Sequence, residues 1–506
     1  MKKLFLLFML SLFTISYAQD TPTNLSVTES ETFKYDKKID GVLAMKTSQA
    51  GNTGVVLRHG KRNAFDKPYY FFDIFNTEFK QVFSEKVEID KDERYVGDIF
   101  YDGILKVFTV YKPNRKERTV FLHLLDIDSK TYKRIKLFDA KIQKKQSLFA
   151  SKRSHSTSFS VSPNRKYFAL ATDNVSKKMN DYNIRVFDNK TNTLVYNKSY
   201  QTDEEKTYEH NELYVDDNAV VYSVGKRYLS KKQRKKLEGD SRYKFVLNKI
   251  TENSAEAVDI TLDDKHIQSL TISVIKDELH LLGFYSEKNE NRLKGGCSFI
   301  INTENFNVKS KKFQKLPKQV YDDLYNNRAS ERKNKKDKEL NNFYIDHIIT
   351  DSSNNTFLVA EEFYVTSQYV QSGQFGGYWT YVYHYDDILI LKFNSEGNLD
   401  WGRSIFKKST SPSYNAFYKD DKLHVILNSG KNLKEKKDGR IKVSKGLFES
   451  TSLYDVEFTV DGKVQYNKIQ DNRGNTKYIP YYGTYELDRF IMPNDSGRKK
   501  QFIILE

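Results

Sequence analysis

Aromatic side chains alternate along one stretch of this sequence at a spacing that suits a binding surface. Trp379, Tyr381, Tyr383 and Tyr385 occupy every second position, and a β-strand places alternate residues on one side. Rings with a flat apolar face and a polar edge suit stacking on sugars or anchoring a protein partner. The competing interpretation is cross-strand packing that only stiffens a hairpin. The aromatic candidate ligand-binding residues are Tyr364, Tyr369, Phe375, Trp379, Tyr381, Tyr383 and Tyr385.

Basic side chains are the second chemical feature. The formal net charge is +16, and the segments 231–236 and 436–440 are dense in lysine and arginine. An excess of this size attracts polyanions, although each run on its own is typical of a solvated loop. The basic candidate ligand-binding residues are Lys231, Lys232, Arg234, Lys235, Lys236, Lys436, Lys437 and Arg440.

Motifs for catalysis and for cofactors are missing from the sequence. It contains no nucleophile elbow, no His-Glu-x-x-His, no phosphate-binding loop and no calcium loop. The nine histidines are scattered, and the single cysteine, Cys297, lies in an apolar stretch typical of a buried thiol. We therefore predict no metal, no cofactor and no catalytic residue recognisable by motif.

The first eighteen residues have the pattern of a secretory signal peptide. Lys2 and Lys3 precede an apolar run, and Ser16, Tyr17 and Ala18 end it at a cleavage-type spacing. No cysteine lies near this site, and no later segment is apolar enough to span a bilayer. We expect export to the periplasm or cell surface without a lipid anchor or a transmembrane segment, which also disfavours a nucleic-acid partner.

The elements that must position these residues recur along the chain. An apolar strand, a turn rich in Asp, Asn, Gly or Thr and a more polar strand recur, as at 70–83, 120–137 and 183–196. A further strand pair precedes each copy, so the unit is a four-stranded antiparallel meander. These units predict an all-β fold, a β-propeller with eight blades, or seven if one weak unit is miscounted.

Closure of the ring is expected to involve the N-terminus. The last unit supplies three strands and ends at 502–505, while 32–39 forms a strand without partners. Adding this N-terminal strand to the last blade removes an open sheet edge. The predicted domain covers residues 19–506 after a signal peptide at 1–18.

Two short stretches resemble known blade signatures. Residues 162–170 resemble the blade signature of TolB-like and WD40-like propellers, with Asn164 and Arg165 in place of its Asp and Gly. Residues 387–401 resemble the blade repeat of secreted bacterial propellers. Each resemblance covers one blade, so it implies the fold and no activity.

Insertions are expected to collect on one side of the ring. In a meander, loops between the second and third strands emerge with the connections between blades, and we call this side the loop face. It should carry most basic runs, a helical or disordered basic insertion at 317–341 and a long hairpin at 355–394. The other side, the plain face, should have only short turns.

These observations favour a monomeric, non-catalytic binding or scaffold protein of the cell envelope. Its partner would be an anionic polysaccharide, an envelope component or a protein that meets the basic, aromatic-rich face. The alternative is a carbohydrate-active enzyme, a hydrolase or lyase, with carboxylates in the central channel.

Overall fold

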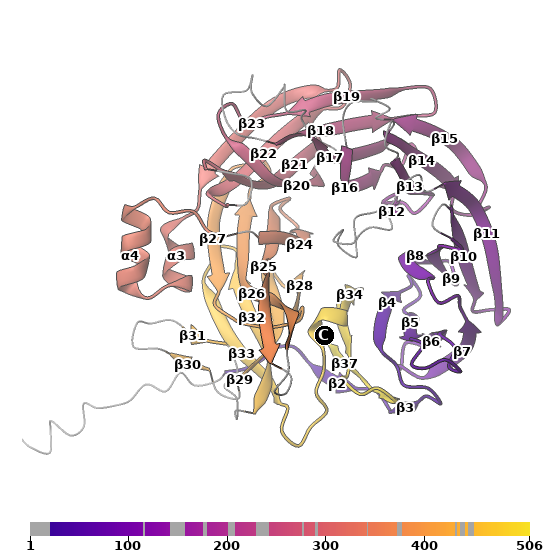
Figure 1. The fold of residues 1–506 in the computed structure, drawn as a ribbon. Helices are drawn as coiled ribbons and strands as arrows, with labels where there is room; N and C mark the ends of the chain where they lie inside the picture. Colours follow the sequence, from indigo (N-terminus) through magenta and orange to yellow (C-terminus); the bar gives the residue numbers. More distant parts are fainter. Residues whose placement is uncertain are drawn as a thin grey trace, which may run out of the picture.

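The computed structural model describes residues 21–114, 117–141, 157–175, 180–200, 208–228, 242–275, 278–288, 292–341, 343–371, 377–430, 433–435, 441–443 and 450–506. Within them, seven sheets of four strands and one of five stand around a common axis (Figure 1). This is an eight-bladed β-propeller of antiparallel blades, so the predicted fold class and blade number are confirmed. Among the described helices, none is long and apolar enough to cross a membrane.

Blades 1 to 4 follow the chain from their inner to their outer strands. Blade 1 contains β4 (Gly41–Thr47), β5 (Thr53–His59), β6 (Tyr69–Phe75) and β7 (Gln81–Glu88). Blade 2 contains β8 (Arg94–Tyr101), β9 (Ile104–Tyr111), β10 (Glu117–Asp126) and β11 (Thr131–Lys141). Blade 3 contains β12 (Thr157–Val161), β13 (Tyr167–Val175), β14 (Asn180–Asp188) and β15 (Leu194–Tyr200). Blade 4 contains β16 (Tyr208–Val215), β17 (Val221–Tyr228), β18 (Tyr243–Ile250) and β19 (Ala255–Ile260).

Blades 5 to 8 complete the ring. Blade 5 contains β20 (His266–Ile275), β21 (Glu278–Ser286), β22 (Gly295–Asn302) and β23 (Asn307–Lys315). Blade 6 contains β24 (Phe343–Thr350), β25 (Thr356–Gln371), β26 (Gly377–Phe393) and β27 (Leu399–Ile405). Blade 7 contains β28 (Tyr414–Lys419), β29 (Lys422–Gly430), β32 (Thr451–Thr459) and β33 (Val464–Asp471). Blade 8 contains β34 (Thr484–Glu486), β35 (Arg489–Pro493), β37 (Phe502–Leu505) and β2 (Val27–Glu29).

The core lies between neighbouring blades. Middle strands are covered on both sides, so they are nearly continuous apolar runs, such as Val55, Val56 and Leu57 in β5, which are fully buried. Outer strands such as β7 and β23 alternate exposed and half-buried residues because only one side meets a neighbour. Arg165 takes a positive φ of 59° in the turn before β13, at the position where the resembled signature has glycine.

The N-terminal segment closes the ring, as predicted, but through a different stretch. β2 pairs antiparallel with β37, whereas the expected range 32–39 forms only β3 (Phe33–Lys34), paired with β36 (Lys499–Lys500). Phe33 and Ile39 instead pack into the core between blades 8 and 1. Upstream, β1 (Thr21–Pro22) adds to the outer edge of blade 7, in parallel with β33. The chain therefore bridges blades 7, 8 and 1 at the seam.

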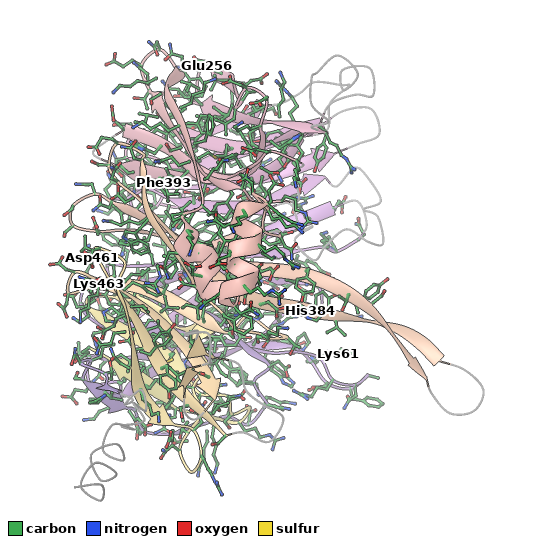
Figure 2. The ribbon with its side chains drawn as sticks, turned by 90° about the vertical axis from the view of Figure 1, so that its left-hand side faces the viewer. Lys61, Glu256, His384, Phe393, Asp461 and Lys463 are labelled. Carbon is green, nitrogen blue, oxygen red and sulfur yellow. The ribbon has the colours of Figure 1, made fainter. Side chains whose placement is uncertain are left out.

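The loops between second and third strands lie on the opposite side of the ring from the turns between third and fourth strands. In the side view, Lys61 of the loop between β5 and β6 and His384 of the extended strand β26 lie on one side (Figure 2). Phe393, Asp461 and Lys463, near turns between third and fourth strands, lie on the other. The segment 317–341 contains α3 (Lys318–Leu324) and α4 (Asn327–Lys335), and α3 packs against blade 6 through Val320, Tyr321 and Leu324. The minor elements are β30 (Lys434–Glu435), β31 (Ile441–Lys442) and the 3-10 helix η1 (Pro480–Tyr482).

Candidate functional site

The second and third strands of blade 6 continue far past their neighbours. β24 pairs with β25 only as far as Glu362, and β27 pairs with β26 only from Ile388 onward. Beyond a register shift between Glu361 and Phe363, the two strands pair with each other as a ribbon. We call residues 363–371 and 377–385 the hairpin extension. It projects from the loop face well beyond the ring (Figure 2).

One side of the hairpin extension forms an aromatic face. The register pairs Phe363 with Tyr385, Val365 with Tyr383 and Ser367 with Tyr381, which places the alternating tyrosines on one side. The ring centroids of Phe363 and Tyr385 are 4.9 Å apart, and those of Phe363 and Tyr383 are 6.3 Å apart. Tyr381, Tyr383 and Val365 are 59%, 49% and 44% exposed. This row of large side chains therefore packs along its own strands and leaves its outer surface in solvent.

The opposite side of the hairpin extension is more polar. Tyr364 stacks on His384 with ring centroids 4.4 Å apart, and Thr366 Oγ1 lies 2.9 Å from His384 Nε2. The Tyr364 hydroxyl donates to Asp386 at 2.8 Å. Tyr364 is thus held on the side away from Tyr381 and Tyr383, and the two groups do not form one surface.

Acidic residues surround the root of the hairpin extension. Glu361 and Glu362 end the ring portion of β25, and Asp386 and Asp387 face them on β26. Lys407, which is 4% exposed, donates to Glu361 Oε1 at 2.6 Å and to the Tyr385 carbonyl at 2.8 Å. This buried ion pair ties the root to the segment that leads into blade 7.

Burial and mutual repulsion shift the titration of these carboxyl groups. Burial, together with the nearby Glu362 and Asp386, raises the pKa of Asp387 to about 7. Burial also raises the pKa of Glu361, and the Lys407 ammonium opposes this rise. The root is therefore acidic and partly protonated near neutral pH.

The hairpin and the basic runs are chemically separate. No lysine or arginine occurs between residues 351 and 391, so the aromatic face has no cation of its own. At the root, the buried Lys407 is paired with Glu361, and Lys333 and Lys408 lie close enough to act on Glu362. The structure thus gives the hairpin an aromatic and acidic character.

Several predicted site residues fall outside this description. The backbone register pairs Tyr369 with Trp379, but their side chains are not described. The remaining predicted residues lie outside the described residues: Phe375, Lys231, Lys232, Arg234, Lys235, Lys236, Lys436, Lys437 and Arg440.

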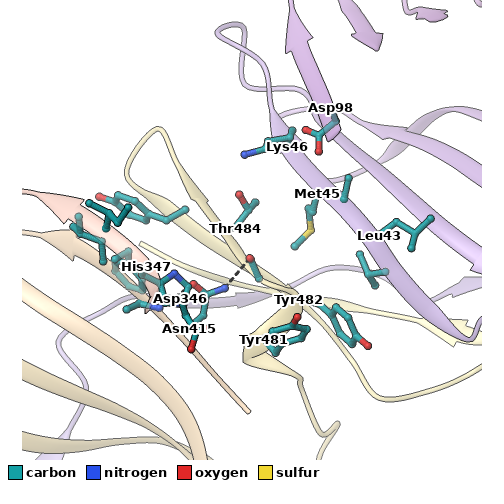
Figure 3. Close-up of a pocket in the computed structure, with 18 of the residues that line it drawn as sticks. Leu43, Met45, Lys46, Asp98, Asp346, His347, Asn415, Tyr481, Tyr482 and Thr484 are labelled. Carbon is teal, nitrogen blue, oxygen red and sulfur yellow. Dashed lines mark hydrogen bonds between the residues drawn. The ribbon is translucent and has the colours of Figure 1, made fainter. Parts of the chain in front are cut away.

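The central channel contains a cavity of about 900 Å³ (Figure 3). Its walls come from the inner strands of blades 1, 2, 6 and 7, together with η1 and β34 of blade 8. Asp98 of blade 2 and Asp346 of blade 6 lie on different walls. Tyr95 donates to Asp98, and the Tyr414 hydroxyl donates to Asp346 at 2.9 Å.

The other charged groups of the cavity are also engaged. Lys46 Nζ lies 3.6 Å from a carboxylate oxygen of Glu486, and the Asn415 side chain donates to the Gly483 carbonyl at 2.8 Å. Burial lowers the pKa of His347 to about 4, so its ring is neutral at pH 7, and it raises the pKa of Asp98. The carbohydrate-active alternative stays a prediction, because it needs a ligand held between two of these carboxyl groups.

One group of residues in the described structure has the composition of a metal site. Ligand atoms of His424, Asp455 and Glu457, all buried in blade 7, lie within 4.8 Å of one another. His424 Nδ1 is 3.0 Å from Asp455, Lys422 Nζ is 2.5 Å from Glu457, and Thr23 donates to Asp455 at 3.3 Å. These contacts satisfy the carboxylates within the protein and attach the N-terminal segment to blade 7.

Sequence reasoning found the aromatic row but missed its root and the channel residues. Glu361 and Lys407 are far apart in sequence, and Asp346 meets Tyr414 only because blades 6 and 7 are neighbours. A signal for the root was present, since the acidic doublets 361–362 and 386–387 flank the hairpin symmetrically.

The arrangement of the described sheets defines the class of protein, a β-propeller. No family model and no curated protein matches the chain. The β-propeller domain of the Trilobed protease from Pyrococcus furiosus is 10% identical with a TM-score of 0.38, over 83% of this chain and 94% of that one. The polysaccharide lyase Uly1 is 9% identical with a TM-score of 0.39, over 81% and 88% of the two chains. A putative 6-phosphogluconolactonase from Bacteroides fragilis is 10% identical with a TM-score of 0.35, over 77% and 88%. Likeness at this level carries no argument about activity.

Proposed function

We propose that this chain is a non-catalytic binding protein that holds a protein partner through the aromatic face of its hairpin extension. The observation that carries the proposal is the exposure of Tyr381, Tyr383 and Val365 on a ribbon that stands clear of the ring. Tyrosine offers a large, rigid contact surface with a polar tip, and it is enriched at the energetic centres of protein interfaces.

The charge around the hairpin favours a protein over an anionic polysaccharide. The aromatic face has no cation of its own, and Glu361, Glu362, Asp386 and Asp387 lie at its root. An acidic polymer laid along this ribbon would find no cation on the ribbon itself to bind its negative groups. A protein surface that offers apolar side chains and some basic residues fits better.

The backbone of the ribbon offers a second means of recognition. Residues 363–371 and 377–385 pair with each other, apart from one bond from the Tyr385 amide to the Ser409 carbonyl at 2.9 Å. A two-stranded ribbon in water is marginally stable and presents strand edges to which an extended segment can add. A partner strand would stabilise the ribbon while its side chains contact the aromatic face.

Export belongs to the same proposal. The charged and apolar pattern of residues 1–18 supports secretion to the periplasm or cell surface, where the partner would be an envelope or secreted protein. Cys297, the single cysteine, is buried, so packing between blades supplies the stability of the fold.

The test is a comparison of matched hairpin variants in quantitative affinity capture from an envelope protein extract of the source cells. The double variant Tyr381→Ser/Tyr383→Ser alters the aromatic face, and Thr366→Ala/Val382→Ala alters the opposite side at paired positions. We expect at least one protein to be captured by the wild type and the control but about tenfold less by the tyrosine variant. Equal capture by all three proteins would refute the proposal.

A further inference from the structure

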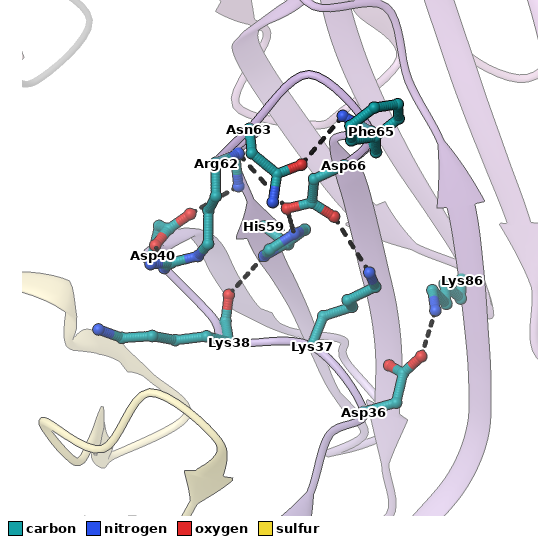
Figure 4. A network of polar contacts seen from close by, with 11 residues as sticks. Asp36, Lys37, Lys38, Asp40, His59, Arg62, Asn63, Phe65, Asp66 and Lys86 are labelled. Carbon is teal, nitrogen blue, oxygen red and sulfur yellow. Dashed lines mark hydrogen bonds and ion pairs between the residues drawn. The ribbon is translucent and has the colours of Figure 1, made fainter.

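A second pocket lies at the seam where the two ends of the chain meet. It encloses about 340 Å³ and is formed by three segments: the linker before β4, the loop between β5 and β6, and the turn before β36 (Figure 4). We call it the seam pocket. Its lining residues are Lys37, Lys38, His59, Arg62, Asn63, Phe65, Asp66 and Arg498.

The seam pocket has a surplus of positive charge. Lys37 is paired with Asp66 at 3.0 Å, and Arg62 is paired with Asp40. Lys38 and Arg498 are exposed, and neither has an ion-pair partner within the part of the chain that the structure describes. These two cations come from opposite ends of the chain and are accessible to an anionic ligand.

The floor of the pocket is buried and hydrogen-bonded. His59 is 2% exposed, and its two ring nitrogens lie 2.7 Å from the Lys38 carbonyl and 2.8 Å from Asp66. Both partners are hydrogen-bond acceptors, and the ring links the Lys38 backbone to the Asp66 side chain. Asp66 stays ionised because Lys37 and His59 lower its pKa to about 2. The floor therefore needs no further partner, and the cations at the rim keep their capacity to bind.

Two other residues shape the rim. The aliphatic stem of Lys38 crosses Gly497, where a Cβ would lie 2.8 Å from Lys38 Cγ, and this places Lys38 beside Arg498. Phe65 stands at the tip of its loop, 97% exposed, and its amide donates to Asn63 Oδ1 at 3.0 Å. The rim thus combines free cations with an uncovered aromatic ring.

We propose that the seam pocket binds an acidic sugar unit of an anionic polysaccharide. The carboxylate or sulfate group enters between Lys38, Arg62 and Arg498, and the sugar ring lies against Phe65. An anionic bilayer offers the same negative charge but no sugar ring to lie against Phe65, and the vesicle arm of the test distinguishes the two. The proposal uses none of the residues of the hairpin extension.

The position of the pocket has a consequence for stability. Lys38 follows the closing strand β2, and Arg498 precedes its partner β37, so one ligand contacts both ends of the chain. A ligand that binds only the closed ring stabilises the closed ring. Binding should therefore raise the temperature of thermal unfolding as well as give a direct binding signal.

The test compares charge-matched variants of the full chain. Lys38→Ala/Arg498→Ala removes the free cations of the pocket, and Lys133→Ala/Lys190→Ala removes two exposed lysines near turns between third and fourth strands. Polygalacturonate and dextran sulfate are the carboxylate and sulfate probes, neutral dextran is the blank, and phosphatidylglycerol vesicles are the membrane arm. Affinity is measured by calorimetry, with the shift in unfolding temperature as a second readout.

We expect the wild type and the Lys133/Lys190 control to bind one or both acidic polymers with similar affinity. The Lys38/Arg498 variant should bind about tenfold more weakly and lose the temperature shift. Phe65→Ala should weaken binding severalfold without changing the net charge, and Tyr381→Ser/Tyr383→Ser should leave it unchanged. The proposal is wrong if neither polymer binds, if the control loses as much affinity as the pocket variant, or if vesicles bind and the polymers do not.

Discussion

At the scale of single residues, the root of the hairpin gathers several carboxyl groups in a buried place. Four carboxyl groups, on Glu361, Glu362, Asp386 and Asp387, share one buried cation, Lys407. Removing water from like charges makes ionisation unfavourable, so some of these groups keep a proton near neutral pH. The hairpin is therefore anchored at a place where protonation affects folding.

Replacing Asp387 by Asn should change how stability depends on pH. The native pKa of about 7 lies above the usual value of 3.8, so the folded protein holds more protons than the unfolded chain between these limits. The wild type therefore loses stability as pH rises from about 4 to about 7, by up to about 1.4 kcal/mol per pH unit for one such group. Asp387→Asn keeps an acceptor for the Lys407 amide, which lies 3.1 Å from Oδ1, and removes this loss.

Thermal unfolding of both proteins across this pH range checks the sign. The unfolding temperature of Asp387→Asn should rise relative to that of the wild type as pH rises. In the control Asp461→Asn, Lys463 holds the pKa of the native carboxyl at about 2, below the range tested, so variant and wild type should run parallel. If the unfolding temperature of Asp387→Asn rose relative to that of the wild type as pH fell, the raised pKa of Asp387 would be contradicted.

At the scale of elements, the hairpin extension is an appendage of blade 6. None of its described residues belongs to the hydrophobic clusters between blades, and its aromatic contacts are mostly internal. The alternation of tyrosines predicted the row correctly, because the side-chain period of a strand is two. Tyr364 could not be placed by the same reasoning, since its side depends on a register shift at Glu361 that no local pattern marks.

Excising the extension should leave the ring intact. Val365 and Tyr383 are directly paired, so residues 366–382 can be replaced by an Asn-Gly turn that joins them. We expect the unfolding temperature to change by less than about 2 °C, because no core contact is lost. Calorimetry checks this, and a large drop would mean that the hairpin is a structural brace.

At the scale of the whole molecule, ring closure shows how far sequence reasoning extends. The blade number follows from local strand and turn patterns, and the missing fourth strand of the last blade required closure from the N-terminus. The position of the closing strand was wrong because β2 is exposed at all three residues and pairs through its backbone, so it has no apolar pattern. Phe33 and Ile39 have such an apolar pattern, but their side chains pack into the core between blades 8 and 1. The seam pocket could not be predicted from the sequence either, because Lys38 and Arg498 line the same pocket only when the ring is closed.

Deleting residues 21–30 should open the ring. The deletion uncovers β37, whose four residues are buried, and removes Leu25 from the core between blades 7 and 8. We expect the unfolding temperature to fall by about 5–10 °C and the protein to associate through the exposed edge. Calorimetry and light scattering measure both effects. The control Val27→Thr/Thr28→Ser keeps the backbone hydrogen bonds of β2 and should unfold at the same temperature as the wild type. If its unfolding temperature fell as much as that of the deletion, the side chains of β2 and not its backbone would close the ring.

The central claim is that the aromatic face of the hairpin extension meets a protein. The most direct measurement places a photocrosslinking amino acid at Tyr383, with Lys190 on the plain face as the control position, and irradiates each protein with envelope extract. The account predicts a discrete adduct at position 383 that protease destroys, glycosidase leaves intact and excess wild-type protein prevents, with the Tyr381→Ser/Tyr383→Ser variant failing to compete. The absence of an adduct at 383, or the same adduct at both positions, would contradict it.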